Sequence, residues 1–493
     1  MTLEYAATRP PGQPLVRAAT VAQVTDQYQD DLGMAIAKTP GTLVPAPDAP
    51  REYVLGIGDG TVAPALHSGR KFVRELPGST EALAIDVSAY LRPHEPGVRL
   101  PQEPLVAFLR GLYLGTYQVD LWKGDRPGPH LPEATLTVVA EGVSGFSESE
   151  TATRLRAALH EAGALAKGQA AAMHLVDRPA NAKRPRDVAQ YVTDLGAAHG
   201  FEVEVVDAEA LEIQGFGGIL NVGRASAHPP YLLKLRYGRS GGYHVGFVGK
   251  GITFDAGGVS IKDAKNMGFM KSDLGGAAAV LGTFVAVAEL GLGVELTGLL
   301  GVAENVIDGD AYLPSDVIRN YGGKTIEITD TDAEGRLVMA DCLAYLPEIA
   351  TPDFTIDVAT LTGSAVQTFG YEAAALFTHD DAEAEAFAKT GEATGERVWR
   401  LPLWEVYDKH LRSDVADVKH FHGLPIAGAI NAAKFLEYFA ADKTRWMHLD
   451  IAPVAFAASD FTVDRAATGY GVTLLTAYLQ SKASSKSETD AAA

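Results

Sequence analysis

The sequence predicts an α/β protein of two domains, the larger with a largely parallel central sheet flanked by helices and the smaller an N-terminal α/β domain. Two observations predict this class. The second half of the chain repeats apolar strand-like runs, and helical stretches separate most of them. These runs span residues 243–249, 295–303, 325–330, 353–360 and 446–452. Such an alternation favours a parallel sheet covered on both faces, which binds ligands beyond the carboxyl ends of its strands; Lys250, Asp332 and Thr360 are expected at such ends.

The composition changes along the chain and suggests four segments. Residues 1–150 alternate short apolar runs with Pro and Gly breaks, which indicates the smaller α/β domain. Residues 151–172 are rich in Ala, Leu, Glu and Arg with helical periodicity, so they are expected to form a connecting helix. Residues 173–480 contain the strand runs and the chemical motifs. Residues 481–493 are small and polar without an apolar face, which predicts a disordered tail.

Composition and charge narrow the functional class. With 493 residues, 47% of them hydrophobic and 21% charged, the chain is typical of a globular protein with substantial cores. Its 42 Lys and Arg residues face 62 Asp and Glu residues, a net charge of −20. This charge opposes adhesion to nucleic acid or to anionic lipid, so it favours an enzyme that acts in solution.

The chain shows no targeting or membrane-spanning pattern. Its first residues lack the basic start, apolar core and cleavage site of a secretory signal, so a cytoplasmic location is expected. The apolar stretch Gly275–Gly293 contains Glu289 and is built largely of glycine and alanine, which predicts a packed core helix. The single cysteine, Cys342, excludes an intrachain disulfide and is expected to be a buried thiol in a helix.

Five charged residues carry the chemistry, and they stand in two short glycine-punctuated stretches. They are Lys250, Asp255, Asp273, Asp332 and Glu334. Asp332 and Glu334 are two residues apart, so in an extended segment both would project from one face. Four crowded carboxylates need cations, which predicts oxygen ligands for two divalent ions. Lys250 could bind a metal only as the neutral amine, and from the residues alone a salt bridge to Asp255 is an open alternative.

These residues lie in two segments that resemble a known family. VGKGITFDAGG at 248–258 and DTDAEGRL at 330–337 are similar to the two signatures of the leucyl (cytosol) aminopeptidase family. This chain has Ala256 where the family has serine and Asp330 where it has asparagine. The resemblance implies a two-metal aminopeptidase that releases N-terminal residues, leucine or other large apolar ones, from peptides by attack of a metal-generated hydroxide.

The resemblance also implies how the metals are held. One would be bound by Asp255, Asp332 and Glu334, and the other by Lys250, Asp255, Asp273 and Glu334. Hard oxygen ligands with one amine would accept Zn²⁺, Mn²⁺, Co²⁺ or Mg²⁺, with zinc or manganese expected first.

Other roles follow from the same resemblance. Lys262 would donate to the developing oxyanion, and Arg336 would bind a bicarbonate that serves as general base. Backbone groups matching Leu361 to Gly363 would complete the bicarbonate site. Met270 is a tentative wall of the substrate pocket, although an ordinary core methionine is equally compatible with the sequence.

The family further implies a homohexamer that acts on short or unfolded peptides. Two other functions stay open from the sequence: a nucleic-acid-binding regulator, which the charge opposes, and a dinuclear phosphohydrolase, whose sites commonly include histidine ligands. His420 and His422 lack a third ligand nearby in the sequence and are expected to be packing or surface residues. The loop HGLPIAGA that includes His422 departs from the family pattern.

Overall fold

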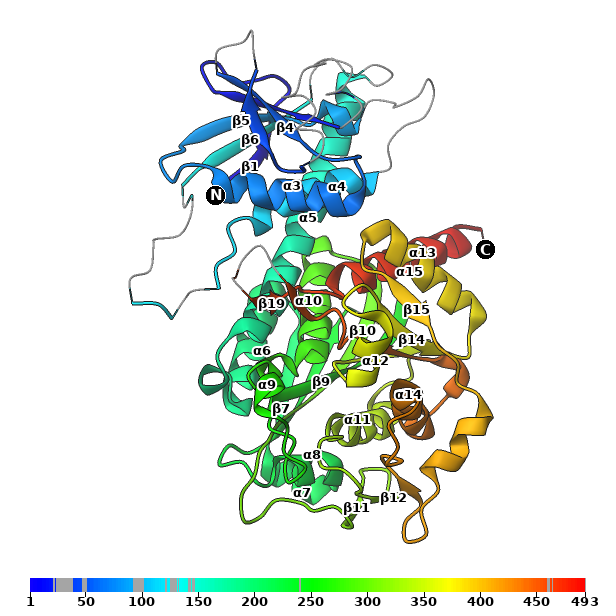
Figure 1. Cartoon of the computed structure of the whole chain (residues 1–493). Coiled ribbons are helices and arrows are strands. Elements are labelled where there is room, and N and C mark those ends of the chain that lie inside the picture. Colours follow the sequence, from blue (N-terminus) through cyan, green and yellow to red (C-terminus); the bar gives the residue numbers. More distant parts are fainter. Residues whose placement is uncertain are drawn as a thin grey trace. The chain divides into compact units, whose positions relative to one another are not determined.

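The computed structural model describes residues 1–20, 23, 39–46, 51–91, 102–119, 122–124, 131, 133–140, 143, 147–238, 241–458, 462 and 464–492. Side chains are described for these residues except Gln102 and residues 485–492. The chain forms two compact units (Figure 1). The N-terminal unit is Met1–Ala166 with Ala393–Gly395, and the large unit is Lys167–Glu392 with Glu396–Ala493.

The N-terminal unit contains a six-stranded sheet in the order β1-β6-β5-β2-β4-β3. All neighbouring strands are parallel except β3 and β4. The strands are β1 (Thr2–Tyr5), β2 (Leu15–Ala19), β3 (Leu43–Pro45), β4 (Glu52–Gly56), β5 (Ala82–Asp86) and β6 (Thr135–Val139). Its helices are α3 (Val62–Glu75), η1 (Ser88–Tyr90) and α4 (Gln102–Leu114). Strands β5 and β6 are buried over four of their five residues, as expected for strands covered on both faces.

Helix α5 (Glu148–Asp177) contains the point at which the two units are divided. Its 30 residues include the whole of the segment 151–172, for which the sequence predicts a connecting helix. Ser147 stands directly before it, and the Glu150 side chain accepts the Ser147 backbone N–H at 2.8 Å. This local bond satisfies a donor at the start of the helix.

The large unit is built on an eight-stranded sheet in the order β15-β14-β17-β13-β9-β10-β8-β7. Its four central strands, β17, β13, β9 and β10, are parallel, which confirms the predicted sheet. The outer pairs β7·β8, β8·β10 and β14·β17 are antiparallel. The strands are β7 (Glu202–Val206), β8 (Tyr231–Tyr237), β9 (Tyr243–Asp255), β10 (Val294–Asn305), β13 (Phe354–Ala359), β14 (Ala374–Thr378), β15 (Val398–Arg400) and β17 (Trp446–Asp450).

Helices cover both faces of the central strands. A Cβ placed on Gly249 of β9 would touch Ala277 of α10 (Gly275–Leu290), whereas one on Gly246 would touch Leu346 of α11 (Gly335–Ile349). Residues three apart in a strand point to opposite faces, so α10 and α11 lie on opposite sides of β9. Both helices and the strands β9 and β10 can be followed in Figure 1.

The remaining elements of the large unit surround this sheet. The helices are η2 (Ala180–Ala182), α6 (Pro185–His199), α7 (Ala208–Gln214), α8 (Gly217–Gly223), α9 (Ala264–Met267), η3 (Met270–Ser272), α12 (Gly363–Phe369), α13 (Asp381–Thr394), η4 (Glu405–Leu411), α14 (Gly428–Phe439), η5 (Lys443–Arg445) and α15 (Val472–Ala492). The hairpin strands are β18 (Phe456–Ala458) and β19 (Arg465–Ala467). Helix α15 continues into the predicted tail 481–493, of which residue 493 lies outside the described residues.

Two predicted strand ends differ from the structure. Residues 325–330 were expected in the central sheet, but β12 (Thr325–Glu327) belongs to a separate sheet with β11 (Val317–Arg319) and β16 (Val418–Lys419). Lys250 lies inside β9 rather than at its end, because β10 supplies pairing partners as far as Asp255. Only Thr360 directly follows a central strand, β13, as expected.

The apolar stretch 275–293 forms the core helix α10, as predicted. The segment Met270–Leu290 is long and apolar enough to cross a membrane, but 83% of its most apolar window is buried inside the protein. It therefore has the environment of a core helix. Cys342 is fully buried within α11, which also confirms the prediction.

Candidate metal centre

The structure brings together all four predicted carboxylates and two lysines at one edge of the large sheet. Lys250 and Asp255 come from the second half of β9, and Lys262 comes from the loop that follows it. Asp273 follows η3, and Asp332 and Glu334 precede α11. We call Asp255, Asp273, Asp332 and Glu334 the acidic cluster.

Three members of the acidic cluster form a compact buried group. Asp255, Asp273 and Glu334 each offer a carboxylate oxygen, and these oxygens all lie within 4.8 Å of one another. The three residues are only 2%, 6% and 1% exposed. Asp332 is more open, with 32% of its side chain exposed. Carboxylates this close and this buried repel one another unless cations or protons neutralise them.

In this structure, the ammonium groups of two lysines supply positive charge to the carboxylates. Lys250 Nζ lies 2.8 Å from Asp273 Oδ1 and 2.8 Å from Glu334 Oε1, and it donates to Thr360 O at 3.1 Å. Lys262 Nζ lies 2.8 Å from Asp255 Oδ2 and also contacts Asp332 Oδ1. Burial disfavours the charge on both lysines, but the surrounding carboxylates outweigh it and raise the pKa of each above its ordinary value.

The carboxylates respond differently to burial. Burial raises the pKa of Asp255 and raises that of Asp273 well above the ordinary value. Burial, together with the charge of Asp255, raises the pKa of Asp332 to about 7. Glu334 is the exception, because the two lysines overcome its burial and lower its pKa. Two ammonium groups therefore do not fully compensate four carboxylates, and the cluster keeps a capacity for added positive charge.

Three oxygens of the cluster have no hydrogen-bond partner in the described structure, and one of them, Asp332 Oδ1, forms an ion pair with Lys262, so two have neither kind of partner. They are Asp273 Oδ2 and Glu334 Oε2, and both are buried. A buried acceptor without a donor is costly unless a ligand satisfies it. Carboxylate oxygens without thiolate or imidazole are ligands for hard or borderline divalent cations, so the residues present fit such an ion.

Neighbouring polar groups orient these carboxylates, and of the side chains that supply them only that of Thr360 was expected near the site from the sequence. Asn305 Nδ2 donates to Asp255 Oδ1 at 2.7 Å, and the Gly257 N–H donates to the same oxygen at 2.9 Å. Thr360 Oγ1 donates to Asp273 Oδ1 at 2.9 Å. Asn305 is the second residue after the predicted strand 295–303, and a polar residue close to that strand end was its signal in the sequence.

The local conformation around Asp332 differs from the prediction. The segment was expected to be extended, but residues 331–332 form a turn and Glu334 has helical dihedrals, φ −69° and ψ −39°. Asp330 Oδ1 accepts the Asp332 N–H at 3.0 Å, which an asparagine could also do. The turn, rather than strand alternation, brings Asp332 and Glu334 together.

Arg336 lies in the first turn of α11, so its direction is also set by the helix. It is 5% exposed, and its Nη1 donates to His420 O at 2.6 Å, while its Nε is buried without a partner. Burial lowers the pKa of Arg336 to about 10. The spare donor of a buried guanidinium fits an anion.

The backbone groups that were expected to bind that anion differ in how freely they could do so. The Leu361 N–H already donates to Asp450 Oδ1 at 3.1 Å, so an anion there would compete with Asp450. Gly363 is the exposed first residue of α12.

The two histidines behave as packing residues, as expected. His420 is fully buried, and its Nε2 donates to Asp330 O at 2.7 Å. Burial, followed by the charge of Arg336, lowers the pKa of His420 to about 4. His422 Nε2 contacts Ile426 O at 2.8 Å. Met270, the tentative pocket residue, is half-buried at the start of η3.

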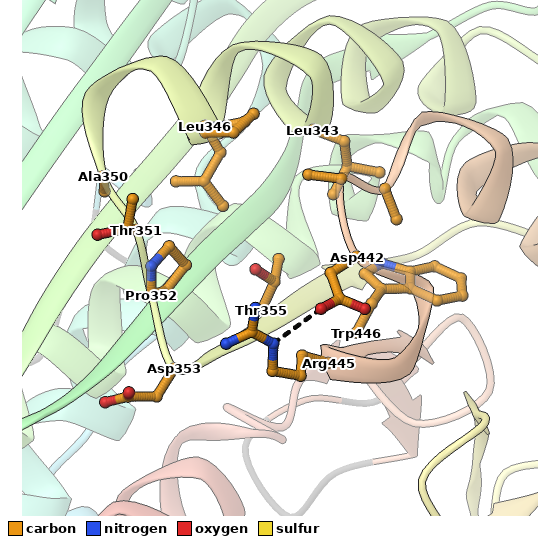
Figure 2. A pocket seen from close by; sticks show the side chains of 13 residues that line it. Leu343, Leu346, Ala350, Thr351, Pro352, Asp353, Thr355, Asp442, Arg445 and Trp446 are labelled. Atoms are coloured by element: carbon orange, nitrogen blue, oxygen red, sulfur yellow. Dashed lines mark hydrogen bonds and ion pairs between the residues drawn. The ribbon is translucent and has the colours of Figure 1, made fainter.

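A separate cavity of about 220 Å³ lies elsewhere in the large unit (Figure 2). It is lined by Leu343, Leu346, Thr355, Asp442, Arg445 and Trp446, among others. It lies near the first residues of β13 and β17, whereas Asp255 of the acidic cluster is the last residue of β9. Its Arg445 Nε donates to Asp442 Oδ2 at 2.8 Å, so this charge is paired locally. None of its lining residues belongs to the acidic cluster.

Comparisons with known proteins find relatives in sequence and in fold. A model of the catalytic domain of the cytosol aminopeptidase family matches residues 170–476. A probable cytosol aminopeptidase of Chlorobium limicola is 38% identical over 436 residues, which cover 88% of this chain and 86% of the relative.

Two solved structures extend the likeness over nearly the whole chain. The bottromycin maturation enzyme BotP in complex with Mn is 32% identical with a TM-score of 0.81, covering 95% of this chain and 99% of that one. The cytosol aminopeptidase of Coxiella burnetii is 29% identical with a TM-score of 0.80, covering 97% and 99%.

Proposed function

Because the chain belongs to the cytosol aminopeptidase family of metal-dependent exopeptidases, we propose that its acidic cluster binds two divalent cations and cleaves leucine or other large apolar residues from the N-termini of peptides. The observation that carries this proposal is the pair of buried, unpartnered oxygens on Asp273 and Glu334 within a group of three converging carboxylates.

The ligands divide into two sets that share two members. Asp255, Asp332 and Glu334 would hold one cation, and Lys250, Asp255, Asp273 and Glu334 the other. The present contacts of the lysines support this division, since Lys262 already bridges Asp255 and Asp332 while Lys250 bridges Asp273 and Glu334. When bound, such a pair of cations lowers the pKa of a bound water to about 7 and acts as a Lewis acid on the scissile carbonyl.

Two charged side chains would act on the substrate around this centre. Lys262, with 17% of its side chain exposed, is the group that would donate to the carbonyl oxygen as it gains negative charge. Arg336, with Leu361 and Gly363, would hold a bicarbonate, and the buried Nε of Arg336 is the donor that supports this role. Met270 would border the side chain of the first residue.

Amino-acid amides test the reaction and its specificity together. Leucine amide is expected to be hydrolysed and N-acetyl-leucine amide to resist, because acetylation removes the free amine that would bind one of the two cations. The rates are measured with Zn²⁺, Mn²⁺, Co²⁺ or Mg²⁺ added after chelation. Equal rates on the acetylated amide would contradict the recognition of a free N-terminus, and cleavage of a phosphate ester in place of leucine amide would reverse the assignment.

We propose that the two cations are zinc or manganese ions. The ligands could also bind magnesium or cobalt. We also propose a homohexamer in the cytoplasm, with the division 1–150, 151–172 and 173–480 into N-terminal domain, connecting helix and catalytic domain. The family membership supports these statements.

Gly335 gives a sharp steric test of the second ligand set. A Cβ on Gly335 would lie 2.3 Å from Lys250 Cε and 2.7 Å from its Nζ. Gly335→Ala is therefore expected to displace Lys250 from Glu334 and Asp273 and to lower kcat/KM by about 100-fold, the usual effect of misplacing a group by ~1 Å. Leucine amide hydrolysis measures this loss. Gly293→Ala, where a Cβ meets nothing within 4 Å, controls for adding a methyl group to a glycine of the large unit outside the site. An equally active Gly335→Ala enzyme would remove Lys250 from the ligand set.

A further inference from the structure

Lys183 is a fully buried lysine in the turn between η2 and α6. It is 0% exposed, and its Nζ donates to three backbone carbonyls: Leu175 O at 3.3 Å, Val176 O at 2.5 Å and Lys271 O at 2.5 Å. Three acceptors match the three N–H groups of an ammonium. None of these acceptors is a carboxylate, so Lys183 is not held by a direct ion pair with any of them.

The environment of Lys183 explains how the charge is tolerated. Leu175 and Val176 belong to the last turn of α5, where carbonyls lack helical partners and the helix dipole is negative. Burial nonetheless lowers the pKa of Lys183, and Lys271 lowers it further. Burying a lysine costs several kcal/mol, so a simple apolar side chain would be the cheaper way to fill this space.

The third carbonyl connects Lys183 to the metal centre. Lys271 is the middle residue of η3, whose helical turn closes through the Asp273 N–H donating to Met270 O at 3.3 Å. Lys271 in return donates from Nζ to Asp177 O at 3.0 Å, so two lysines tie η3 to the end of α5. The carbonyl bound by Lys183 therefore lies between Met270 and Asp273.

We propose that Lys183 is a positioning residue: by binding Lys271 O, it holds η3 against α5 and so fixes the Asp273 carboxylate beside Lys250 and Glu334. The inference rests on the proposed function, because it takes Asp273 as a ligand of the second cation. The effect acts through the backbone, since the three hydrogen bonds of Lys183 go to main-chain carbonyls of residues outside the acidic cluster.

The test is a titration of the metal-free full-length chain with Mn²⁺. Binding is measured as the decrease of the electron paramagnetic resonance signal of free Mn²⁺. Lys183→Met keeps most of the side-chain volume and removes the three donors. We expect the wild type to bind two Mn²⁺ ions, and Lys183→Met to bind one of them at least tenfold more weakly, as for other groups that orient metal ligands. The affinity of the other site should change less than twofold.

Lys434→Met is the matched control. Lys434 is 4% exposed and is paired with Asp408 and Glu437, so its loss also disturbs a buried lysine in the large unit. Both Mn²⁺ affinities should stay at the wild-type values in this variant, whatever happens to its thermal midpoint. If Lys183→Met does not fold, Lys183→Gln, which keeps two N–H donors, replaces it, with the same selective weakening expected.

The outcomes distinguish a failure of the role inferred for Lys183 from a failure of the proposed ligand set. Two unchanged affinities in a folded Lys183 variant, with a lowered thermal midpoint, would reduce Lys183 to a structural residue and overturn the inference. A wild-type chain that binds fewer than two Mn²⁺ ions would refute the proposed ligand set and, with it, the role of Lys183.

Discussion

Replacing Asp255 with asparagine is expected to lower kcat/KM for leucine amide by at least about 10³-fold, equivalent to about 4 kcal/mol of transition-state stabilisation. Asp255 is proposed to belong to both ligand sets, so its loss affects both cations at once. The amide is isosteric and its oxygen can still accept from Asn305 and Gly257, so the fold should persist. Its NH₂ group, however, would face Lys262 where a carboxylate oxygen now lies 2.8 Å away.

Steady-state kinetics and a metal titration measure this effect. Asp207→Asn is the control, because Asp207 caps α7 by accepting the Ala210 N–H and asparagine caps equally well. It should keep full activity and both metal affinities. An Asp255→Asn enzyme that retains more than a tenth of the activity would show that this carboxylate is not shared between two cations.

Lys262→Met is expected to change activity and metal affinity in opposite directions. The loss of a donor to the developing oxyanion should lower kcat by about 10²–10³-fold. Metal binding should become tighter, because in the metal-free protein Lys262 stabilises Asp255 and Asp332, and a cation must displace it. Without the ammonium, the carboxylates repel one another in the metal-free state and that state rises in free energy.

A calorimetric Mn²⁺ titration beside the kinetic assay separates the two effects. Lys262→Arg is the matched control, since it keeps the positive charge and should keep a metal affinity near the wild-type value. Weaker Mn²⁺ binding in Lys262→Met would mean that Lys262 supports the loaded site and does not compete with the cation. Undiminished kcat would remove Lys262 from the reaction.

Part of this architecture can be predicted from the sequence because the signals are local. The long helix α5, the core helix α10, the buried Cys342 and the parallel central strands all follow from periodicity and composition. The structure also brings the four motif carboxylates and Lys262 together, as the two glycine-rich segments suggest.

The other features of the fold and of the site depend on contacts between distant segments, and no local sequence pattern predicts those contacts. Residues 325–327 pair with β11 and β16 instead of the central sheet, which removes Asp332 from a strand end. Glu334 and Arg336 start a helix, so alternation does not set their directions. Lys183 reaches the carbonyl of Lys271, 88 residues away, and nothing in its own neighbourhood indicates this contact.

The burial of Cys342 has a practical consequence for spectroscopy on this chain. As its single thiol is 0% exposed, a maleimide dye should leave the folded protein unmodified. A cysteine introduced on an exposed helix position such as Glu385 of α13 would then carry one fluorophore at one known place. With one such cysteine in each of the two compact units, the distance between the units could be followed in solution without first removing a reactive native thiol.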